Sequence, residues 1–189
     1  MYDRNEMLPL VAGLFREHGY PSITMRGIAR ALDMREAQLR SYFTLKDDLL
    51  WEIVSRTAQL FLLQASLIPL TLPPDEQLRL LVQKHLEVIV HESDYMTVFN
   101  RDWSHLSRER QHEIRQRREQ YEERFTRIID AGQQQGLFSV ADVHEATAVV
   151  LATLHWYCPC CWSIETADNE RFFQQYQIMV TRMLMAHSV

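Results

Sequence analysis

The segment 24–43, TMRGIARALDMREAQLRSYF, restricts the fold more than any other part of the chain. Its first half places apolar residues at the spacing of one helix face: Met25, Ile28, Ala29 and Leu32. Thr24 stands just before them, where its hydroxyl can accept a hydrogen bond from an N–H of the first helical turn. Asp33-Met34 then interrupts the pattern, and a second short helical pattern follows. The segment therefore predicts two short helices joined by a tight turn.

The second of these helices has an apolar side and a polar side. We assign the apolar side to Met34, Ala37, Leu39 and Phe43, and the polar side to Arg35, Glu36, Gln38, Arg40, Ser41 and Tyr42. Arginine and glutamine can form paired hydrogen bonds with base edges, whereas serine, tyrosine and arginine reach phosphates. A helix that exposes these side chains suits the major groove of DNA. We therefore expect a helix-turn-helix whose second helix reads the DNA.

The charge distribution agrees with DNA binding, although the net charge of −5 is unusual for a nucleic-acid-binding protein. Residues 24–46 hold five basic and two acidic side chains, a local charge of +3. Residues 51–189 hold 13 basic and 18 acidic side chains, so the excess of negative charge lies elsewhere in the chain. Because phosphate affinity depends on the local patch, we expect salt-dependent binding that requires two copies of the protein.

The remaining periodic segments are all helical, so the sequence predicts an all-α protein. A helix starts at Asp3 with a D-x-x-E capping pattern and ends at Gly19. A fourth helix is expected over 46–65, and a proline-rich break follows it over 66–74. Later helices are expected over 75–91, 95–106, 107–135, 142–157 and 170–187.

Several classes of protein are not expected from the sequence. No apolar run is long enough for a membrane span, and the N-terminus lacks a secretory signal, so we expect a cytoplasmic protein without membrane contact. The sequence lacks a Gly-rich phosphate loop, a G-x-S-x-G motif, an H-E-x-x-H motif and a recognisable carboxylate pair. We therefore expect neither an enzyme nor a bound cofactor or metal.

Three short patterns resemble the N-terminal domain of the tetracycline-repressor (TetR) family of transcriptional regulators. They are Gly19-Tyr20, Thr24-Met25-Arg26-x-Ile28-Ala29 and Leu39-x-x-Tyr42-Phe43-x-x-Lys46-x-x-Leu49. The chain departs from the family at Asp33-Met34, where Gly-Val is common, and at Arg40-Ser41, where Tyr-His is common. The second departure changes which bases are read. We expect these residues to contact DNA: Thr24, Arg26, Arg35, Gln38, Arg40, Ser41, Tyr42 and Lys46.

The C-terminal part is similar to family members that respond to lipid- or steroid-derived acyl-CoA thioesters. The similarity runs from Trp103-x-x-Leu106-x-x-Glu109-Arg110 through Tyr121-x-x-x-Phe125 to Trp156-Tyr157. Together with the N-terminal resemblance, it implies a DNA-binding domain at residues 1–46 and an effector-binding and dimerisation domain at residues 47–189. It also implies a homodimeric repressor that a small apolar or acyl-CoA-like effector releases from operator DNA. Expected effector contacts are Leu62, Phe99, Trp103, Arg118, Tyr121 and Phe125.

The last two helices are expected to form the dimer interface, because they are more apolar than a monomer surface tolerates. The residues assigned to it are Ala146, Val149, Val150, Thr153, Leu154, Phe173, Tyr176, Ile178, Val180, Met183 and Leu184.

Three cysteines, Cys158, Cys160 and Cys161, leave an alternative input open. Such a cluster can bind a soft metal or respond to oxidants, which would make the protein a thiol- or metal-sensing regulator. A closed zinc site needs four ligands, and the sequence has no second Cys/His cluster at zinc-finger spacing. We therefore assign these cysteines a packing role first.

Overall fold

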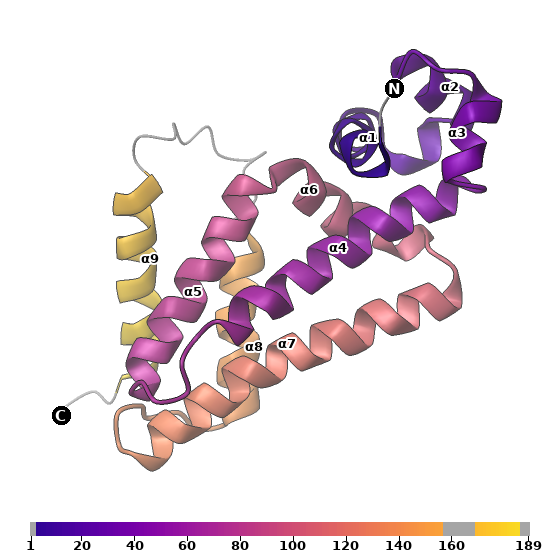
Figure 1. Cartoon of the computed structure of the whole chain (residues 1–189). Helices are drawn as coiled ribbons and strands as arrows, with labels where there is room; N and C mark the ends of the chain where they lie inside the picture. Colours follow the sequence, from indigo (N-terminus) through magenta and orange to yellow (C-terminus); the bar gives the residue numbers. More distant parts are fainter. Residues whose placement is uncertain (1–2, 157–168, 186–189) are drawn as a thin grey trace. The chain divides into compact units, whose positions relative to one another are not determined.

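A computed structural model describes residues 3–156 and 169–185, and within these ranges the chain is helical (Figure 1). The α-helices are α1 (Arg4–His18), α2 (Met25–Ala31), α3 (Glu36–Tyr42), α4 (Lys46–Ser66), α5 (Pro74–His91), α6 (Ser93–Asp102), α7 (Arg108–Gln134), α8 (Val143–Trp156) and α9 (Asn169–Leu184). Two 3₁₀ turns, η1 (Tyr20–Ser22) and η2 (Trp103–His105), connect them. The β structure in the described residues is a single bridge between Phe138 and Met185. The predicted all-α class is confirmed.

The chain forms two compact units, and each combines segments that are distant in sequence. The first unit contains Met1–Gln59 and Glu92–Gln116, and the second contains Leu60–His91 and Arg117–Val189. The long helices α4 and α7 each contribute to both units. The first unit thus joins the predicted DNA-binding segment to α6, η2 and the start of α7.

Helix α1 begins and ends as the sequence predicts. The Asp3 carboxylate accepts from the N–H groups of Asn5 and Glu6, and the Glu6 side chain accepts from the Asp3 N–H, which completes a capping box. Gly19 ends the helix at a φ of 79°, a conformation that glycine adopts at little cost. The apolar side of α1 packs on α6, with Phe15 fully buried.

The turn between α2 and α3 is left-handed at a residue other than glycine. Asp33 has a φ of 52°, and the Met34 N–H donates to the Ala29 carbonyl at 2.9 Å. Aspartate adopts this region more readily than most residues. The departure from Gly-Val at this position therefore still gives a tight turn.

In the second unit, α9 packs mainly on α5, and the end of α9 meets the loop that follows α7 (Figure 1). The Ser139 N–H donates to the Leu184 carbonyl at 2.8 Å, next to the bridge between Phe138 and Met185. A Cβ at Gly132 would lie 2.1 Å from the Phe138 ring, so only glycine lets this ring pack against α7.

The expected helix boundaries agree closely with the structure. The break at 66–74 separates α4 from α5, and the expected helix 95–106 divides into α6 and η2.

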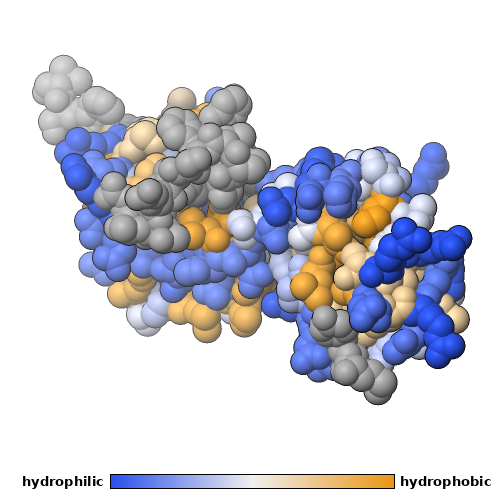
Figure 2. Space-filling view, turned by 90° about the horizontal axis from the view of Figure 1, so that it is seen from above, coloured by the Kyte–Doolittle hydropathy of each residue, from blue (hydrophilic) through white to orange (hydrophobic). Residues whose placement is uncertain are grey.

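The three cysteines lie outside the described residues. None of the helices in the described part of the chain is long and apolar enough to cross a membrane. The face in Figure 2 shows separate apolar groups on a largely hydrophilic surface.

Candidate DNA-binding surface and effector region

Helix α3 is anchored by two buried side chains, and its polar residues are half-buried or exposed. Leu39 and Phe43 are 0% and 1% exposed and pack into the first unit. Ala37, which we expected to face inward, is exposed. The physical reason is the helical period: residue 37 lies about 200° around the helix from residue 39, on the opposite side.

Three arginines surround the turn between α2 and α3 and make no ion pair with the described residues: Arg26, Arg30 and Arg35. All three are exposed. Together with Gln38 they line a hollow of about 550 Å³ at the turn. Since an unpaired surface cation is available to an external anion, this face of α2 and α3 offers positive charge to phosphates.

Helix α2 starts with the predicted cap, which places Arg26 in its first turn. The Thr24 hydroxyl oxygen accepts from the Gly27 N–H at 3.1 Å. Arg35 is the N-cap residue of α3, and its backbone is extended (φ −75°, ψ 144°). Arg35 and Gln38 therefore stand at the N-terminal end of α3, the end of a recognition helix that contacts base edges.

Arg40 and Ser41 are engaged within the protein, in contrast to Arg35. The Arg40 Nε donates to Glu36 Oε1 at 2.9 Å, and a second guanidinium nitrogen donates to the Thr44 carbonyl at 2.8 Å. The Ser41 hydroxyl donates to the Gln38 carbonyl at 2.7 Å. Arg40 would have to leave Glu36 before it could contact a base, so its role in reading DNA is less direct than the sequence suggests.

Lys46 also differs from expectation, because its ammonium group is turned into the first unit. Its Nζ donates to the carbonyl oxygens of Tyr20 (2.8 Å) and Ile23 (3.0 Å) and lies 4.1 Å from the centre of the Tyr20 ring. Burial lowers the pKa of Lys46, and the charge of Asp102 acts in the opposite direction. Lys46 therefore holds the connection between α1 and α2.

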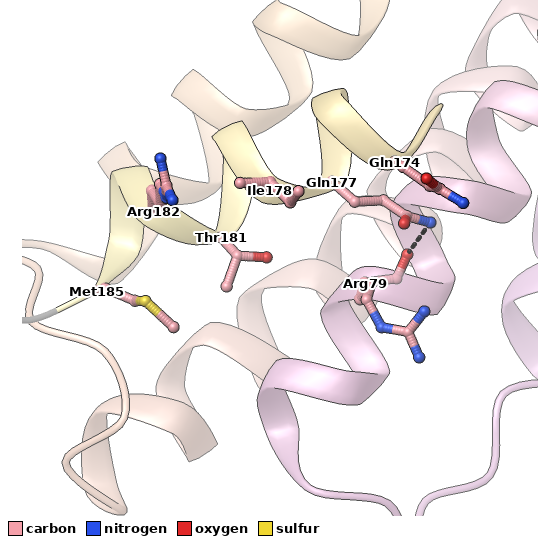
Figure 3. A pocket seen from close by; sticks show the side chains of 7 residues that line it. All are labelled: Arg79, Gln174, Gln177, Ile178, Thr181, Arg182 and Met185. Carbon is pink, nitrogen blue, oxygen red and sulfur yellow. Dashed lines mark hydrogen bonds between the residues drawn. The ribbon is translucent and has the colours of Figure 1, made fainter. Parts of the chain in front are cut away.

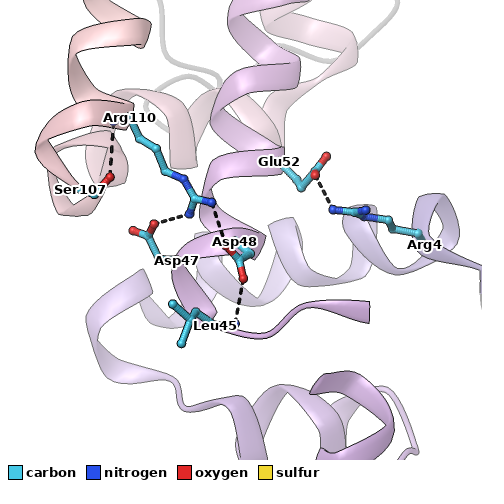
Figure 4. A network of polar contacts seen from close by, with 7 residues as sticks. All are labelled: Arg4, Leu45, Asp47, Asp48, Glu52, Ser107 and Arg110. Atoms are coloured by element: carbon cyan, nitrogen blue, oxygen red, sulfur yellow. Dashed lines mark hydrogen bonds and ion pairs between the residues drawn. The ribbon is translucent and has the colours of Figure 1, made fainter. Parts of the chain in front are cut away.

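Two further arginines, which sequence reasoning left without a role, tie α6 and α7 to the N-terminal helices. Arg101 donates to the Phe15 and Arg16 carbonyls at the end of α1 and forms an ion pair with Asp102, which is 2% exposed. The hydrogen bonds that Arg101 donates to the Asp102 carboxylate raise the pKa of Arg101. Arg110 contacts Asp47 and Asp48 at the start of α4 (Figure 4). No sequence spacing links these partners.

The residues expected to bind the effector divide between the two units. Phe99, 3% exposed, and Trp103, half-buried, belong to the first unit, where the Arg115 guanidinium lies 5.9 Å from the Trp103 ring centre. The second unit contains Leu62, Arg118, Tyr121 and Phe125.

Tyr121 belongs to a buried aromatic group in the second unit. The Phe61 and Phe125 rings lie 5.3 and 5.5 Å from its ring, and its hydroxyl lies 3.0 Å from Nδ1 of His85. Burial raises the pKa of Tyr121, so it stays a neutral phenol. Sequence reasoning missed Phe61 and His85; the only signal was a histidine at 85 within an apolar helix face.

Arg118 is half-buried on α7, one turn before the aromatic group. Burial lowers its pKa, and the nearby Glu122 charge opposes that effect. The arrangement combines an apolar, aromatic interior with a partly desolvated cation. Such a combination suits a ligand with an apolar body and an anionic group. The described residues contain no group of three or more metal-ligating side chains that could hold a metal ion.

A groove of about 670 Å³ lies on the second unit, between α5 and α9 (Figure 3). Its lining residues are Arg79, Gln174, Gln177, Ile178, Thr181, Arg182 and Met185. The Gln177 amide donates to the Arg79 carbonyl at 3.2 Å, which ties the two helices together. The guanidinium groups of Arg79 and Arg182 point in different directions, so they do not form a common anion site (Figure 3).

Helices α8 and α9 expose apolar side chains, although not all of those assigned to a dimer interface. Val150, Leu154, Val180 and Leu184 are buried within the chain, so their assignment to the interface is wrong. Val149, Ile178 and Met183 remain exposed, at 50%, 44% and 42%, and Met179 joins them at 45%. The exposed sides of these helices carry apolar side chains next to polar ones such as Gln174 and Arg182, so apolar character alone does not tell which residues pack inward.

The sequence matches two protein-family models. Residues 12–53 match "Bacterial regulatory proteins, tetR family", and residues 71–159 match "Tetracyclin repressor-like, C-terminal domain". The two segments cover more than half of the chain. The first includes the α2–α3 turn and its unpaired arginines. Among curated proteins, none matches the sequence.

Solved structures of similar fold cover almost the whole chain. One is a TetR family transcriptional regulator, PfmR from Thermus thermophilus, with 25% identity, a TM-score of 0.86, and coverage of 95% of this chain and 98% of that one. The ketosteroid transcriptional regulator KstR2 of Mycobacterium tuberculosis has 22% identity, a TM-score of 0.86, and coverage of 97% and 95%. AibR in complex with isovaleryl coenzyme A and operator DNA has 23% identity, a TM-score of 0.81, and coverage of 96% and 97%.

Proposed function

Because the chain belongs to the tetR family of bacterial regulatory proteins, we propose that it is a homodimeric repressor that an effector releases from operator DNA. Residues 1–46 contact the DNA, and residues 47–189 bind the effector and form the dimer. The observation that carries the proposal is the set of exposed arginines around the α2–α3 turn, which have no ion-pair partner among the described residues.

The proposed base contacts are Arg35 and Gln38, at the N-terminal end of α3. Thr24, Arg26 and Tyr42 are proposed to contact phosphates. Arg40 and Ser41 are proposed to contribute less to DNA binding, since their polar groups also form hydrogen bonds within the protein. Lys46 is proposed to support the site by holding the backbone between α1 and α2 rather than by contacting a phosphate. Arg40 can turn to DNA only when its bond to Glu36 opens, so we expect it to contribute less than Arg35.

Selection of DNA from a random pool tests this function. The wild-type protein should enrich a duplex with two similar half-sites centred about 34–36 Å apart, because each head reads one major groove. The wild type should bind that duplex more tightly than a scrambled one, and the preference should persist as salt is raised. Enrichment of no sequence at all would contradict the proposal.

For the effector, we propose an acyl-CoA thioester. Two features of this chain support it: the buried aromatic group around Tyr121 and the partly desolvated Arg118 guanidinium on the same helix. AibR, which shares the fold, has been crystallised with isovaleryl coenzyme A and operator DNA. The proposed contacts are Leu62, Arg118, Tyr121 and Phe125, while Phe99 and Trp103 stay predictions to be tested separately by alanine substitution.

A titration of isovaleryl-, octanoyl- and palmitoyl-coenzyme A against a preformed protein–DNA complex tests the effector. At least one thioester should release the DNA, and Arg118→Gln should weaken that release. Arg117→Gln is the matched control, because it removes the same charge one position away. If no thioester acts, while an oxidant or a metal ion releases DNA from the wild type but not from a Cys158, Cys160 and Cys161 triple serine variant, the thiol-sensing alternative replaces this proposal.

A further inference from the structure

Arg110, in the first turn of α7, holds two carboxylates of the first turn of α4 (Figure 4). One guanidinium nitrogen donates to Asp47 Oδ2, and the other donates to Asp48 Oδ1 at 2.8 Å. The guanidinium carbon also lies 5.5 Å from the centre of the Trp51 ring. The Arg110 side chain is 27% exposed and both carboxylates are 25% exposed, so solvent screens this contact only in part.

The contact continues from α4 to the end of the reading helix. Asp48 Oδ2 accepts from the Leu45 N–H at 2.8 Å, and Leu45 stands between the end of α3 at Tyr42 and the start of α4 at Lys46. Asp48 therefore fixes the connection between α3 and α4 while Arg110 fixes Asp48. A chain of hydrogen bonds thus leads from α7 to the residues beside α3.

A second ion pair on the same helix provides the contrast. Arg4 of α1 donates to Glu52 of α4 at 2.5 Å through one nitrogen, and their side chains are 52% and 36% exposed (Figure 4). An exposed ion pair contributes little, because water and salt screen it, although the Arg4 guanidinium also lies 4.8 Å from the centre of the Phe43 ring. A forked arginine that contacts two carboxylates also restricts direction, which a single contact does not.

We propose that Arg110 is a positioning residue for DNA binding, which acts through Asp47 and Asp48 and touches no DNA itself. This inference rests on the proposed function, because it concerns how the reading helix is held. Without Arg110, the first turn of α4 loses its restraint on the α7 side, and the direction of α3 becomes less defined. Base contacts tolerate such looseness poorly, since they depend on paired hydrogen bonds.

The salt dependence of DNA affinity separates positioning from direct contact. Arg110→Ala should weaken binding of the selected duplex about tenfold, within the range of coupling between residues of one network. The slope of log K against log salt should stay that of the wild type. An arginine that contacts a phosphate would instead lower that slope by about 0.9. The Arg110→Lys protein cannot form the fork, and its DNA affinity should lie between those of the wild type and Arg110→Ala.

Arg16→Ala is the matched control, because it removes an ion pair with Asp94 whose side chains are 50% and 40% exposed, and it should change the affinity less than twofold. Asp47→Asn provides a second measurement: Arg110→Ala should cost less in that background than in the wild type, because part of the fork is already lost. Circular dichroism and thermal unfolding show that each variant is folded at the assay temperature. If Arg110→Ala does not fold, Arg110→Lys replaces it in these measurements.

Three results would overturn the inference. If the Arg110→Ala protein binds the selected duplex with wild-type affinity, the fork does not position α3. If its slope of log K against log salt is lower than that of the wild type, Arg110 contacts DNA. Equal costs of Arg110→Ala with and without Asp47→Asn would show that it does not act through Asp47. If the wild type itself selects no duplex, the proposed function fails and this inference fails with it.

Discussion

Two surfaces of this protein expose side chains of opposite chemistry. The face of α2 and α3 in the first unit presents Arg26, Arg30 and Arg35 without ion pairs among the described residues. The face of α8 and α9 in the second unit presents apolar groups such as Val149 and Met183. Exposed cations are well hydrated and cost little in the absence of a partner, whereas exposed apolar surface is unfavourable in water.

The difference indicates which interaction gives each surface its binding free energy. The arginines contribute binding free energy because a polyanion that binds them releases its counterions, so this contribution depends on the salt concentration. The apolar face gains whenever another apolar surface covers it, in the presence or absence of DNA. We therefore expect substitutions in the apolar face to have the larger effect on DNA affinity, because a monomer binds DNA with one helix-turn-helix instead of two.

The largest predicted effect follows from Val149→Arg. In an interface related by a two-fold axis, the same surface patch of each subunit takes part, so the substitution places a charge on both sides. Light scattering at micromolar concentration should show a monomer, and affinity for the selected duplex should fall by roughly a hundredfold or more, since two linked heads bind far more tightly than one. Leu63→Arg is the control, because Leu63 is also 50% exposed but lies on α4. A Val149→Arg protein that remains dimeric would contradict the assignment.

The next effect concerns the reading helix. Arg35→Ala should relax sequence preference, because a good base contact contributes about 1–3 kcal/mol of discrimination. Arg26→Ala should weaken the binding of all DNA sequences alike and lower the slope of log K against log salt by about 0.9. Competition between the selected and a scrambled duplex at several salt concentrations distinguishes the two behaviours. If Arg35→Ala keeps full discrimination, Arg35 does not read bases.

The sequence predicted the helices of both units well, because periodicity, caps and breaks are local. Thr24, the Asp3–Glu6 capping box and Gly19 all act where the sequence places them. The left-handed backbone of Asp33 also lies at the predicted turn.

Side-chain partners could not be predicted in the same way. Arg110 meets Asp47 and Asp48 from more than sixty positions away, and Arg101 meets Phe15 from 86 positions away. A helical pattern indicates on which face a long side chain starts, but not where its charged end lies. The same limit explains Lys46, which turns to backbone carbonyls.

Lys46→Met tests that internal role and should have a moderate effect. The substitution keeps most of the apolar stem and removes the ammonium group, so the Tyr20 and Ile23 carbonyls lose their charged donor. We expect a loss of about 1–2 kcal/mol in the free energy of unfolding, measured by urea denaturation. The salt slope of DNA binding should stay that of the wild type. A slope reduced by about 0.9 would return Lys46 to the phosphate contacts.

The smallest predicted effect is the pH dependence of the contact between Arg110 and Asp48. Burial alone would raise the pKa of Asp48, but the hydrogen bonds from Arg110 and from the Leu45 N–H outweigh it and hold the pKa below its usual range. A carboxylate with a lowered pKa in the folded protein stabilises the fold above its unfolded pKa of about 3.9, and this contribution disappears as pH falls through the folded pKa. The difference in unfolding free energy between the wild type and Arg110→Ala should therefore be full at pH 7 and shrink below about pH 4. In an Asp48→Asn background, the part of this difference that comes from Asp48 should be absent at every pH. A difference that stays constant from pH 7 down to about pH 3 would show that carboxylate charge does not hold Arg110 in place.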